Sequence, residues 1–346
     1  MNLNNIHKIG GEFEIDPSYL KGISSYEPKS DLFFYSSGRS ALMAILGHIS
    51  ETNPKTIHIP YYICQSVVDT CTLAGFKIQF YEIYDSFLLP VEYIDKVKRN
   101  ETLLTVNYFG FVEDNISIKT IKGKRPDIIT ISDQTQSFWT YKNSHADYSF
   151  TSLRKQFPVP DGALIHTSDA SQINKDSIEV NTFHQPKLLG SILKWYKSDD
   201  ELYLHFFEEG EQILDNKDQI QKASKVSQYI FENLNFEEIK QQRKENAQLI
   251  YELGKKSGLN FVFELGDNTI PLNIPILLQN RDAVRKSLMK ENIFLPIHWS
   301  LERFNSNSEK AKFIANQELS LIVDQRYSKN DILRQIETLN KNIHEH

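Results

Sequence analysis

Short apolar segments alternate with amphipathic segments through the first half of this chain, and that alternation constrains the fold more than any other feature. Each apolar segment has the length of a strand and is followed by a turn and then by a helical pattern. Strands joined by helices form βαβ units, which assemble into a largely parallel sheet. The pattern predicts strands at 32–35, 56–59, 77–81, 102–107 and 127–131.

Long helical patterns replace this alternation after residue 181. Apolar residues recur at spacings of three and four from Ile220 to Leu234, which is typical of an amphipathic helix. Further strands are predicted at 259–263 and 271–278 and before Pro296, with helices that begin at Asp282 and Lys329. The sequence therefore predicts an N-terminal arm at 1–30, a large α/β domain at 31–215, and a small C-terminal α+β domain with linking helices at 216–346.

The composition excludes several classes of function. With 24% charged and 40% hydrophobic residues and a formal net charge of −6, the chain resembles an ordinary globular protein without a basic surface for nucleic acid. It has no apolar stretch of membrane-spanning length and no signal-peptide layout at its start, so we expect a cytoplasmic protein with no membrane partner. The two cysteines, Cys64 and Cys71, belong to no Cys/His cluster, so we expect no metal.

Residues 147–163 place one lysine, Lys155, in a stiff turn. Pro158 and Pro160 prevent a helix from continuing, and Gly162 permits a tight return into a second strand beside the first. A lysine held there, with apolar neighbours that disfavour its charged form, can attack an aldehyde. An exposed loop lysine without a chemical role is the alternative.

A second candidate is the turn Ser36–Ser40, which lies between a strand and a helix. Free N–H groups at a helix N-terminus bind anions, the small residues Ser37, Gly38 and Ser40 let a phosphate approach, and Arg39 adds positive charge. A plain helix cap is the alternative.

Three more positions follow strands or turns. Tyr61 and Tyr62 follow a strand, where an aromatic ring stacks on a flat cofactor or packs in the core. Asp133 follows the strand 127–131, where its carboxylate keeps a pyridine nitrogen protonated or caps a helix. His298 and Trp299 follow Pro296 and either line a pocket or pack internally. A phosphate turn, an aromatic ring, an aspartate and a lysine are together the contacts that hold pyridoxal 5′-phosphate (PLP).

The chain resembles the DegT/StrS family of PLP-dependent sugar-nucleotide aminotransferases, which have the fold-type I architecture of the aspartate aminotransferase superfamily. The resemblance covers roughly residues 9–335, and Asp133, Gln136 and Lys155 are its most specific residues. Its motifs are residues 9–13, 37–42, 60–64, 133–136, 152–155, 158–162, 296–299 and 324–327.

The resemblance implies a mostly parallel mixed sheet flanked by helices, and a role for each matching residue. Lys155 is implied to bond the cofactor aldehyde, Asp133 to contact the pyridine nitrogen and Gln136 the ring hydroxyl. The remaining implied cofactor contacts are Gly38, Arg39, Ser40 and Ser152 for the phosphate and Cys64 or Tyr62 for stacking, while His298 and Trp299 are candidates for substrate binding.

The implied function is transfer of an amino group, from glutamate, to the keto group of a nucleotide-linked deoxysugar in surface polysaccharide or related glycan biosynthesis. The implied working unit is a homodimer. The alternative is a catalytically inactive regulatory or binding protein with the same fold.

Overall fold

The computed structural model describes residues 7–19, 34–111, 115–168, 173, 178–197, 199–216, 219–300 and 307–345. Contacts divide the chain into two compact units. Unit 1 comprises Met1–Gly11, Phe109–Phe111 and Glu237–His346, and unit 2 comprises Glu12–Tyr108 and Val112–Phe236. These limits differ from the boundaries that the sequence predicts at 30/31 and 215/216. Residues 1–6 and 20–30 of the predicted arm lie outside the described residues.

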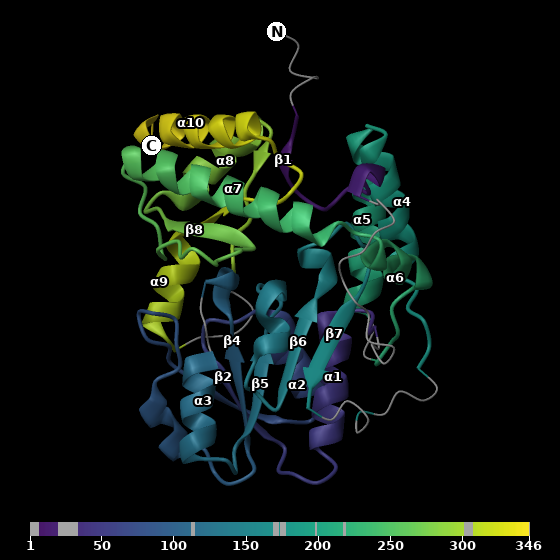
Figure 1. Cartoon of the computed structure of the whole chain (residues 1–346), viewed down its shortest axis with the longest axis vertical. Helices are drawn as coiled ribbons and strands as arrows, with labels where there is room; N and C mark the ends of the chain where they lie inside the picture. Colours follow the sequence, from purple (N-terminus) through teal and green to yellow (C-terminus); the bar gives the residue numbers. More distant parts are fainter. Residues whose placement is uncertain are drawn as a thin grey trace. The chain divides into compact units, whose positions relative to one another are not determined.

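Unit 2 contains a six-stranded sheet in the order β3-β2-β4-β5-β6-β7. Figure 1 labels β2, β4, β5, β6 and β7 of this sheet. Neighbouring strands are parallel except β7, which runs antiparallel to β6. This confirms the predicted mixed, mostly parallel sheet. The strands are β2 (Thr56–Pro60), β3 (Lys77–Tyr81), β4 (Thr102–Val106), β5 (Ile129–Asp133), β6 (Tyr148–Ser152) and β7 (Ala163–Thr167). Residues 32–33 of the predicted strand 32–35 lie outside the described residues, and Tyr35 forms isolated bridges to Ala163 and Lys222.

Helices connect the parallel strands of unit 2, as a parallel sheet requires. Helix α1 contacts α2 and lies against β6 and β7. The α-helices are α1 (Gly38–Ile49), α2 (Gln65–Leu73), α3 (Asn115–Lys124), α4 (His184–Trp195), α5 (Asp200–Asp215) and α6 (Lys225–Glu232). Short 3-10 helices are η2 (Pro17–Tyr19), η3 (Val91–Lys96), η4 (Tyr108–Gly110), η5 (Phe138–Asn143) and η6 (Leu153–Lys155).

The sheet of unit 2 is stable because its central strands are buried. All five residues of β4 are buried, and Ile57, Ile59 and Ile131 have no exposed surface. Each fully buried side chain of this size contributes about 1.5–3 kcal/mol. A rigid sheet of this kind fixes the positions of the residues that follow its strands.

Unit 1 is an α+β unit, as predicted. Its strands β8 (Asn273–Leu277) and β10 (Glu318–Ile322) pair antiparallel, and β1 (Ile9–Gly10) pairs parallel with β9 (Ile293–Phe294). Its helices are α7 (Phe236–Lys256), α8 (Arg281–Lys290), α9 (Glu309–Gln317) and α10 (Lys329–Glu345). The predicted strand at 259–263 is present only as a bridge between Phe261 and Ile276.

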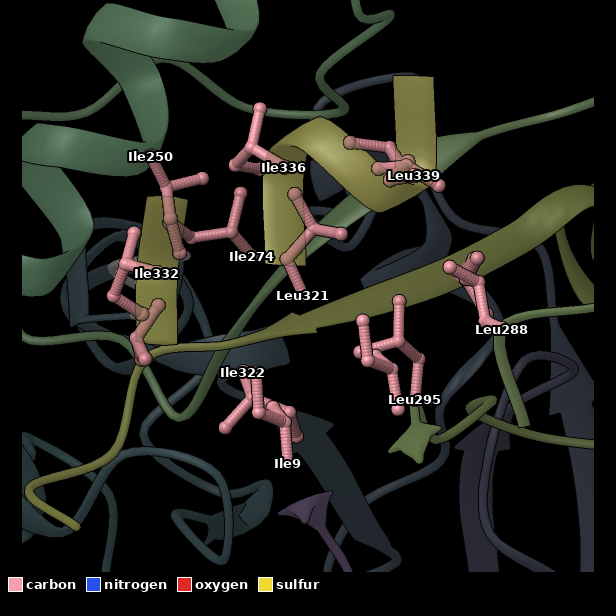
Figure 2. Packing of buried hydrophobic residues seen from close by; sticks show 14 of the residues in the cluster. Ile9, Ile250, Ile274, Leu288, Leu295, Leu321, Ile322, Ile332, Ile336 and Leu339 are labelled. Atoms are coloured by element: carbon pink, nitrogen blue, oxygen red, sulfur yellow. The ribbon is translucent and has the colours of Figure 1, made fainter. Parts of the chain in front are cut away.

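The core of unit 1 includes a residue from the start of the chain. Ile9 is fully buried in a cluster with residues of β8, β10 and α10 (Figure 2). The next residue, Gly10, has φ +101°, and a Cβ there would lie 2.2 Å from the carbonyl oxygen of Phe294. Glycine is therefore required for β1 to pair with β9.

No helix among the described residues combines the length and the apolar character that crossing a membrane requires.

Candidate active site

The carboxyl ends of β4, β5 and β6 meet at one edge of the sheet in unit 2. Val106 pairs with Asp133, and Asp133 pairs with Phe150, so three parallel strands end in nearly the same register. The last residue of β5 is Asp133 and the last residue of β6 is Ser152. Ligands of open α/β sheets bind outside the carboxyl ends of the strands. The predicted site residues Asp133 and Ser152 are thus at the edge where a ligand is expected.

Asp133 is a buried carboxylate, with a relative exposure of 7%. Its Oδ1 accepts a hydrogen bond from the backbone N–H of Thr135 at 2.9 Å, which closes a tight turn. The next helix, η5, has Ser137 at its N-cap, so the alternative prediction that Asp133 caps a helix is wrong for η5. The nearby Gln136 is also buried, with a relative exposure of 4%.

A polar network that the sequence does not reveal fixes this turn. Asn107 directly follows β4, and its Nδ2 donates to Gln134 Oε1 at 3.1 Å and to Thr140 Oγ1 at 3.3 Å. The carbonyl oxygen of Gln134 accepts a hydrogen bond from the Thr151 hydroxyl at 2.9 Å. The turn after Asp133 is therefore held from both neighbouring strands.

The N-terminus of α1 lies against this same edge. Ser37 is the N-cap residue, and its hydroxyl accepts a hydrogen bond from the backbone N–H of Ser40 at 3.2 Å. A Cβ built on Gly38 would lie 3.6 Å from Ser152 Cβ and 3.8 Å from Thr135 Oγ1. The structure thus brings together the predicted phosphate turn, the end of β6 and the turn that carries Asp133.

Gly38 provides a test of whether this edge fits a phosphate. The three nearest atoms to its added Cβ lie at 3.6 to 3.8 Å, which is ordinary contact, and its φ is outside the left-handed region. Neither packing nor backbone conformation therefore requires glycine at this position. An absent Cβ at a helix N-terminus does leave room for an anion beside the free N–H groups. The residues present fit the phosphate group of PLP.

The side chains of Arg39 and Ser40 have other partners. Arg39 Nη1 donates to Asp215 Oδ1 at 2.6 Å. The hydroxyl oxygen of Ser40 accepts hydrogen bonds from Gln221 N–H at 2.9 Å and from the Ser36 hydroxyl at 3.0 Å. Ser40 therefore attaches the segment before α6 to the start of α1, and the phosphate contacts of both side chains stay predictions.

Lys155 ends the 3-10 turn η6 immediately after β6. The N–H of Leu153 donates to the carbonyl oxygen of Gly162 at 2.9 Å, and Gly162 has φ +127°. This closes the tight loop into the antiparallel strand β7, which confirms the predicted turn. The Lys155 side chain is exposed, so the prediction of apolar surroundings is wrong.

Arg154, the residue before Lys155, belongs to a network of charged side chains. Glu211 lies 2.6 Å from Arg154 and 2.6 Å from Lys187, and Lys187 lies 3.2 Å from Glu12. Burial alone would raise the pKa of Glu211, but Arg154 and Lys187 outweigh burial and hold it well below its ordinary value. Burial would also raise the pKa of Glu12, and the charges of Lys187, Arg154 and Lys155 lower it. The sequence gives no sign of this network, because its members come from four separate segments.

The Tyr62 ring, which is predicted to stack on the cofactor, has no exposed face. Tyr62 has no exposed surface, and its ring stacks on Tyr108 with a centroid separation of 5.6 Å. Tyr61 stacks on Phe80 at 5.1 Å. Cys64 is half-buried at the N-cap of α2, with its Sγ 3.1 Å from Ser66 Oγ. A role for Cys64 beside the cofactor stays a prediction.

His298 and Trp299, the predicted substrate residues, belong to unit 1, whereas the edge that carries Asp133 belongs to unit 2. The His298 side chain contacts Ser320 and Phe109 within unit 1.

A mostly parallel sheet that carries a helix N-terminus, an aspartate and a lysine turn at one edge, together with an α+β unit, matches the fold of the fold-type I aminotransferases. Among solved structures, the chain is similar to Spr1654 from Streptococcus pneumoniae, assigned as a sugar aminotransferase, in its PLP form. The TM-score is 0.70 at 14% identity over 98% of this chain and 99% of that chain.

Two further solved structures of aminotransferases are similar to this chain. PseC from Helicobacter pylori, an aminotransferase involved in the biosynthesis of pseudoaminic acid, matches with a TM-score of 0.65 at 15% identity, over 98% of this chain and 100% of that chain. A DegT/DnrJ/EryC1/StrS aminotransferase from Brucella abortus matches with a TM-score of 0.61 at 16% identity, over 94% and 87% of the two chains. No protein-family profile and no curated protein sequence matches the chain. The predicted resemblance is therefore confirmed at the level of the fold.

Proposed function

We propose that this protein is a PLP-dependent aminotransferase that acts on a keto sugar. One observation carries the proposal: the N-terminus of α1 at Gly38 lies beside Thr135, two residues after Asp133, and beside Ser152, three residues before Lys155. This arrangement supports a site in which a phosphate-binding helix N-terminus, a carboxylate and a lysine turn lie at one edge of one sheet.

Each residue of this edge has a place in holding PLP. The N–H groups at Gly38 and the Ser152 hydroxyl would hold the phosphate, Asp133 the pyridine nitrogen, Gln136 the ring hydroxyl and Lys155 the aldehyde carbon. When bound, PLP supplies an electron sink that stabilises negative charge on a substrate carbon.

The chain's own groups would control the protons of this reaction. The buried carboxylate of Asp133 would hold a proton on the ring nitrogen of the cofactor. Lys155 is a primary amine on an exposed side chain, so it can reach a substrate carbon and carry a proton to or from it. The Arg154 side chain, next to Lys155, pairs with Glu211, and Lys187 joins Glu211 to Glu12, so this network would help to position the Lys155 turn.

The substrates are proposed from the relatives. PseC and Spr1654 are described as an aminotransferase of pseudoaminic acid biosynthesis and a sugar aminotransferase. We infer that the acceptor is a nucleotide-linked keto deoxysugar of surface polysaccharide or related glycan biosynthesis, and that the donor is glutamate.

The working unit is proposed to be a homodimer. Helices α4 and α5 expose large apolar side chains, among them Leu189 at 40%, Trp195 at 38% and Leu204 at 55%. Exposed apolar side chains gathered on two packed helices mark a protein contact surface. In a dimer with a twofold axis, this apolar surface of each chain would be buried against the other chain in the same way.

The proposal is tested by reduction with borohydride in the presence of PLP, followed by peptide mass spectrometry. We expect the cofactor on the peptide that contains Lys155, and no label in a Lys155→Ala variant that still binds PLP. A label on a different lysine would refute the site. A protein that binds PLP but whose cofactor spectrum does not change with glutamate would support the alternative, an inactive regulatory or binding protein.

A further inference from the structure

Strand β10 of unit 1 carries two polar residues inside a buried element. Glu318 and Ser320 have relative exposures of 1% and 0%. Residues two apart on a strand share one face, so both side chains lie on the same side of β10. The intervening Leu319 and the next residue, Leu321, belong to the apolar cluster. Leu321 is labelled in Figure 2. A buried carboxylate is costly unless hydrogen-bond donors satisfy it.

Both hydrogen-bond donors to Glu318 are connected to His298. Glu318 Oε2 accepts a hydrogen bond from the backbone N–H of His298 at 2.6 Å, and Oε1 accepts one from the Ser320 hydroxyl at 2.5 Å. The Ser320 oxygen in turn lies 3.0 Å from His298 Nδ1. The N–H of Ser320 donates to the carbonyl oxygen of Pro296 at 3.0 Å, which attaches the segment of His298 to β10.

The direction of these bonds determines which nitrogen of His298 carries the proton. Both oxygens of Glu318 accept, as expected of an ionised carboxylate. A hydroxyl has one proton, and Ser320 gives it to Glu318. The contact between Ser320 and His298 therefore requires a proton on Nδ1, since otherwise two lone pairs would face each other. In the neutral ring, Nε2 then has the free lone pair.

Nε2 is the nitrogen that the protein leaves available. Within the described parts of the chain, His298 Nε2 has no hydrogen-bond partner, while the His298 side chain is 14% exposed. Phe109 and Trp299 pack edge-to-face on the ring at centroid distances of 5.5 and 5.9 Å. The ring is thus held from two sides with one acceptor nitrogen unused.

We propose that Glu318 and Ser320 are positioning residues that hold His298 as the Nδ1–H tautomer, so that Nε2 accepts a hydrogen bond from a hydroxyl group of a ligand. The identity of that ligand as a sugar substrate rests on the proposed function. The tautomer does not, because it follows from contacts within unit 1.

The first test is nitrogen-15 NMR of the histidine rings in the cofactor-free protein at about pH 8.5, above the ordinary histidine titration. We expect the Nδ1–H pattern for His298 in the wild type, its loss in Ser320→Ala and its return in Ser320→Thr, which keeps the hydroxyl. Ser257→Ala, which removes a hydroxyl that bonds only within α7 and the turn after it, is the control and should leave the pattern unchanged. An Nε2–H pattern in the wild type would overturn the proposal.

The second test measures access to the lone pair of Nε2. Diethyl pyrocarbonate reacts with an unprotonated imidazole nitrogen, and His7, whose side chain is 54% exposed, serves as the internal reference. We expect His298 to be labelled in the wild type and to lose most of this labelling in Ser320→Ala. Labelling of His7 without labelling of His298 would show that Nε2 is not available and would refute the acceptor role. Neither test needs PLP or turnover, so failure of the proposed enzyme activity is distinguished from failure of this inference.

Discussion

Replacement of Gly38 by alanine should change the affinity for PLP without lowering the stability of the folded chain. In the chain alone, the new methyl group would lie at ordinary contact distance, 3.6 Å from Ser152 Cβ. Alanine is favoured over glycine in a helix by up to about 1 kcal/mol, so the free energy of unfolding should stay the same or rise by that amount. With a phosphate at the N-terminus of α1, the methyl group would take space that the ligand needs. Overpacking of this kind costs about 1–3 kcal/mol, so the Kd for PLP should rise about fivefold to more than a hundredfold.

The same helix offers a matched control. A Cβ on Gly47 would meet nothing within 4 Å, so Gly47→Ala should also keep or raise stability and should leave the Kd for PLP unchanged. The assays are thermal denaturation of the cofactor-free variants and titration with PLP followed by absorbance. Equal PLP affinity in Gly38→Ala and Gly47→Ala would refute the assignment of this helix N-terminus to the phosphate. A large loss of stability in cofactor-free Gly38→Ala would instead show that packing requires the glycine.

Three further outcomes are expected. Asp133→Ala should bind PLP but turn over about a hundredfold to a thousandfold more slowly, and near wild-type kcat would reduce Asp133 to a turn-forming residue. The lowered pKa of Glu211 means that its carboxylate stabilises the fold above the ordinary value of 4.5 and that this contribution is lost as the pH falls below it. The difference in unfolding free energy between wild type and Glu211→Gln should therefore shrink on acidification, and a constant difference in urea titrations would contradict the pairing. Light scattering should find a dimer that dissociates in Ile192→Glu, a change at an exposed apolar side chain of α4. Leu73→Glu, at a side chain 51% exposed on α2, should not dissociate it. A wild-type monomer that transaminates would exclude a shared site.

The central strands of the sheet in unit 2 could be predicted because they are largely buried, as β4 is at all five residues. Such strands are rich in β-branched residues, and the charged residue that ends one marks the edge of the sheet, as Asp133 does after Ile129–Ser132. The same local signal failed at 259–263, where an apolar segment has only the bridge of Phe261 to another strand. Strand assignment there depended on a partner that the local pattern does not reveal.

The surroundings of Lys155 could not be predicted, because they depend on segments far away in the sequence. Glu12, Lys187 and Glu211 come from the N-terminal segment, α4 and α5. Each is a single charged residue in a polar stretch, which the sequence alone assigns to a solvated surface. Only the folded chain shows that Lys187 is 2% exposed and paired on both sides.

A residue identifies a ligand site most strongly where the folded chain gives no other reason for that residue. Ser40 has another reason, since its hydroxyl accepts two hydrogen bonds within the protein. Loss of activity in Ser40→Ala would therefore not count as evidence for phosphate binding, because the change would also release the segment at Gln221. Gly38 and Lys155 differ: packing does not require the glycine, and the lysine side chain is exposed without a hydrogen bond to the described residues. Variants at these two positions should change cofactor binding while the fold stays intact, which makes them the decisive tests of the proposed enzyme.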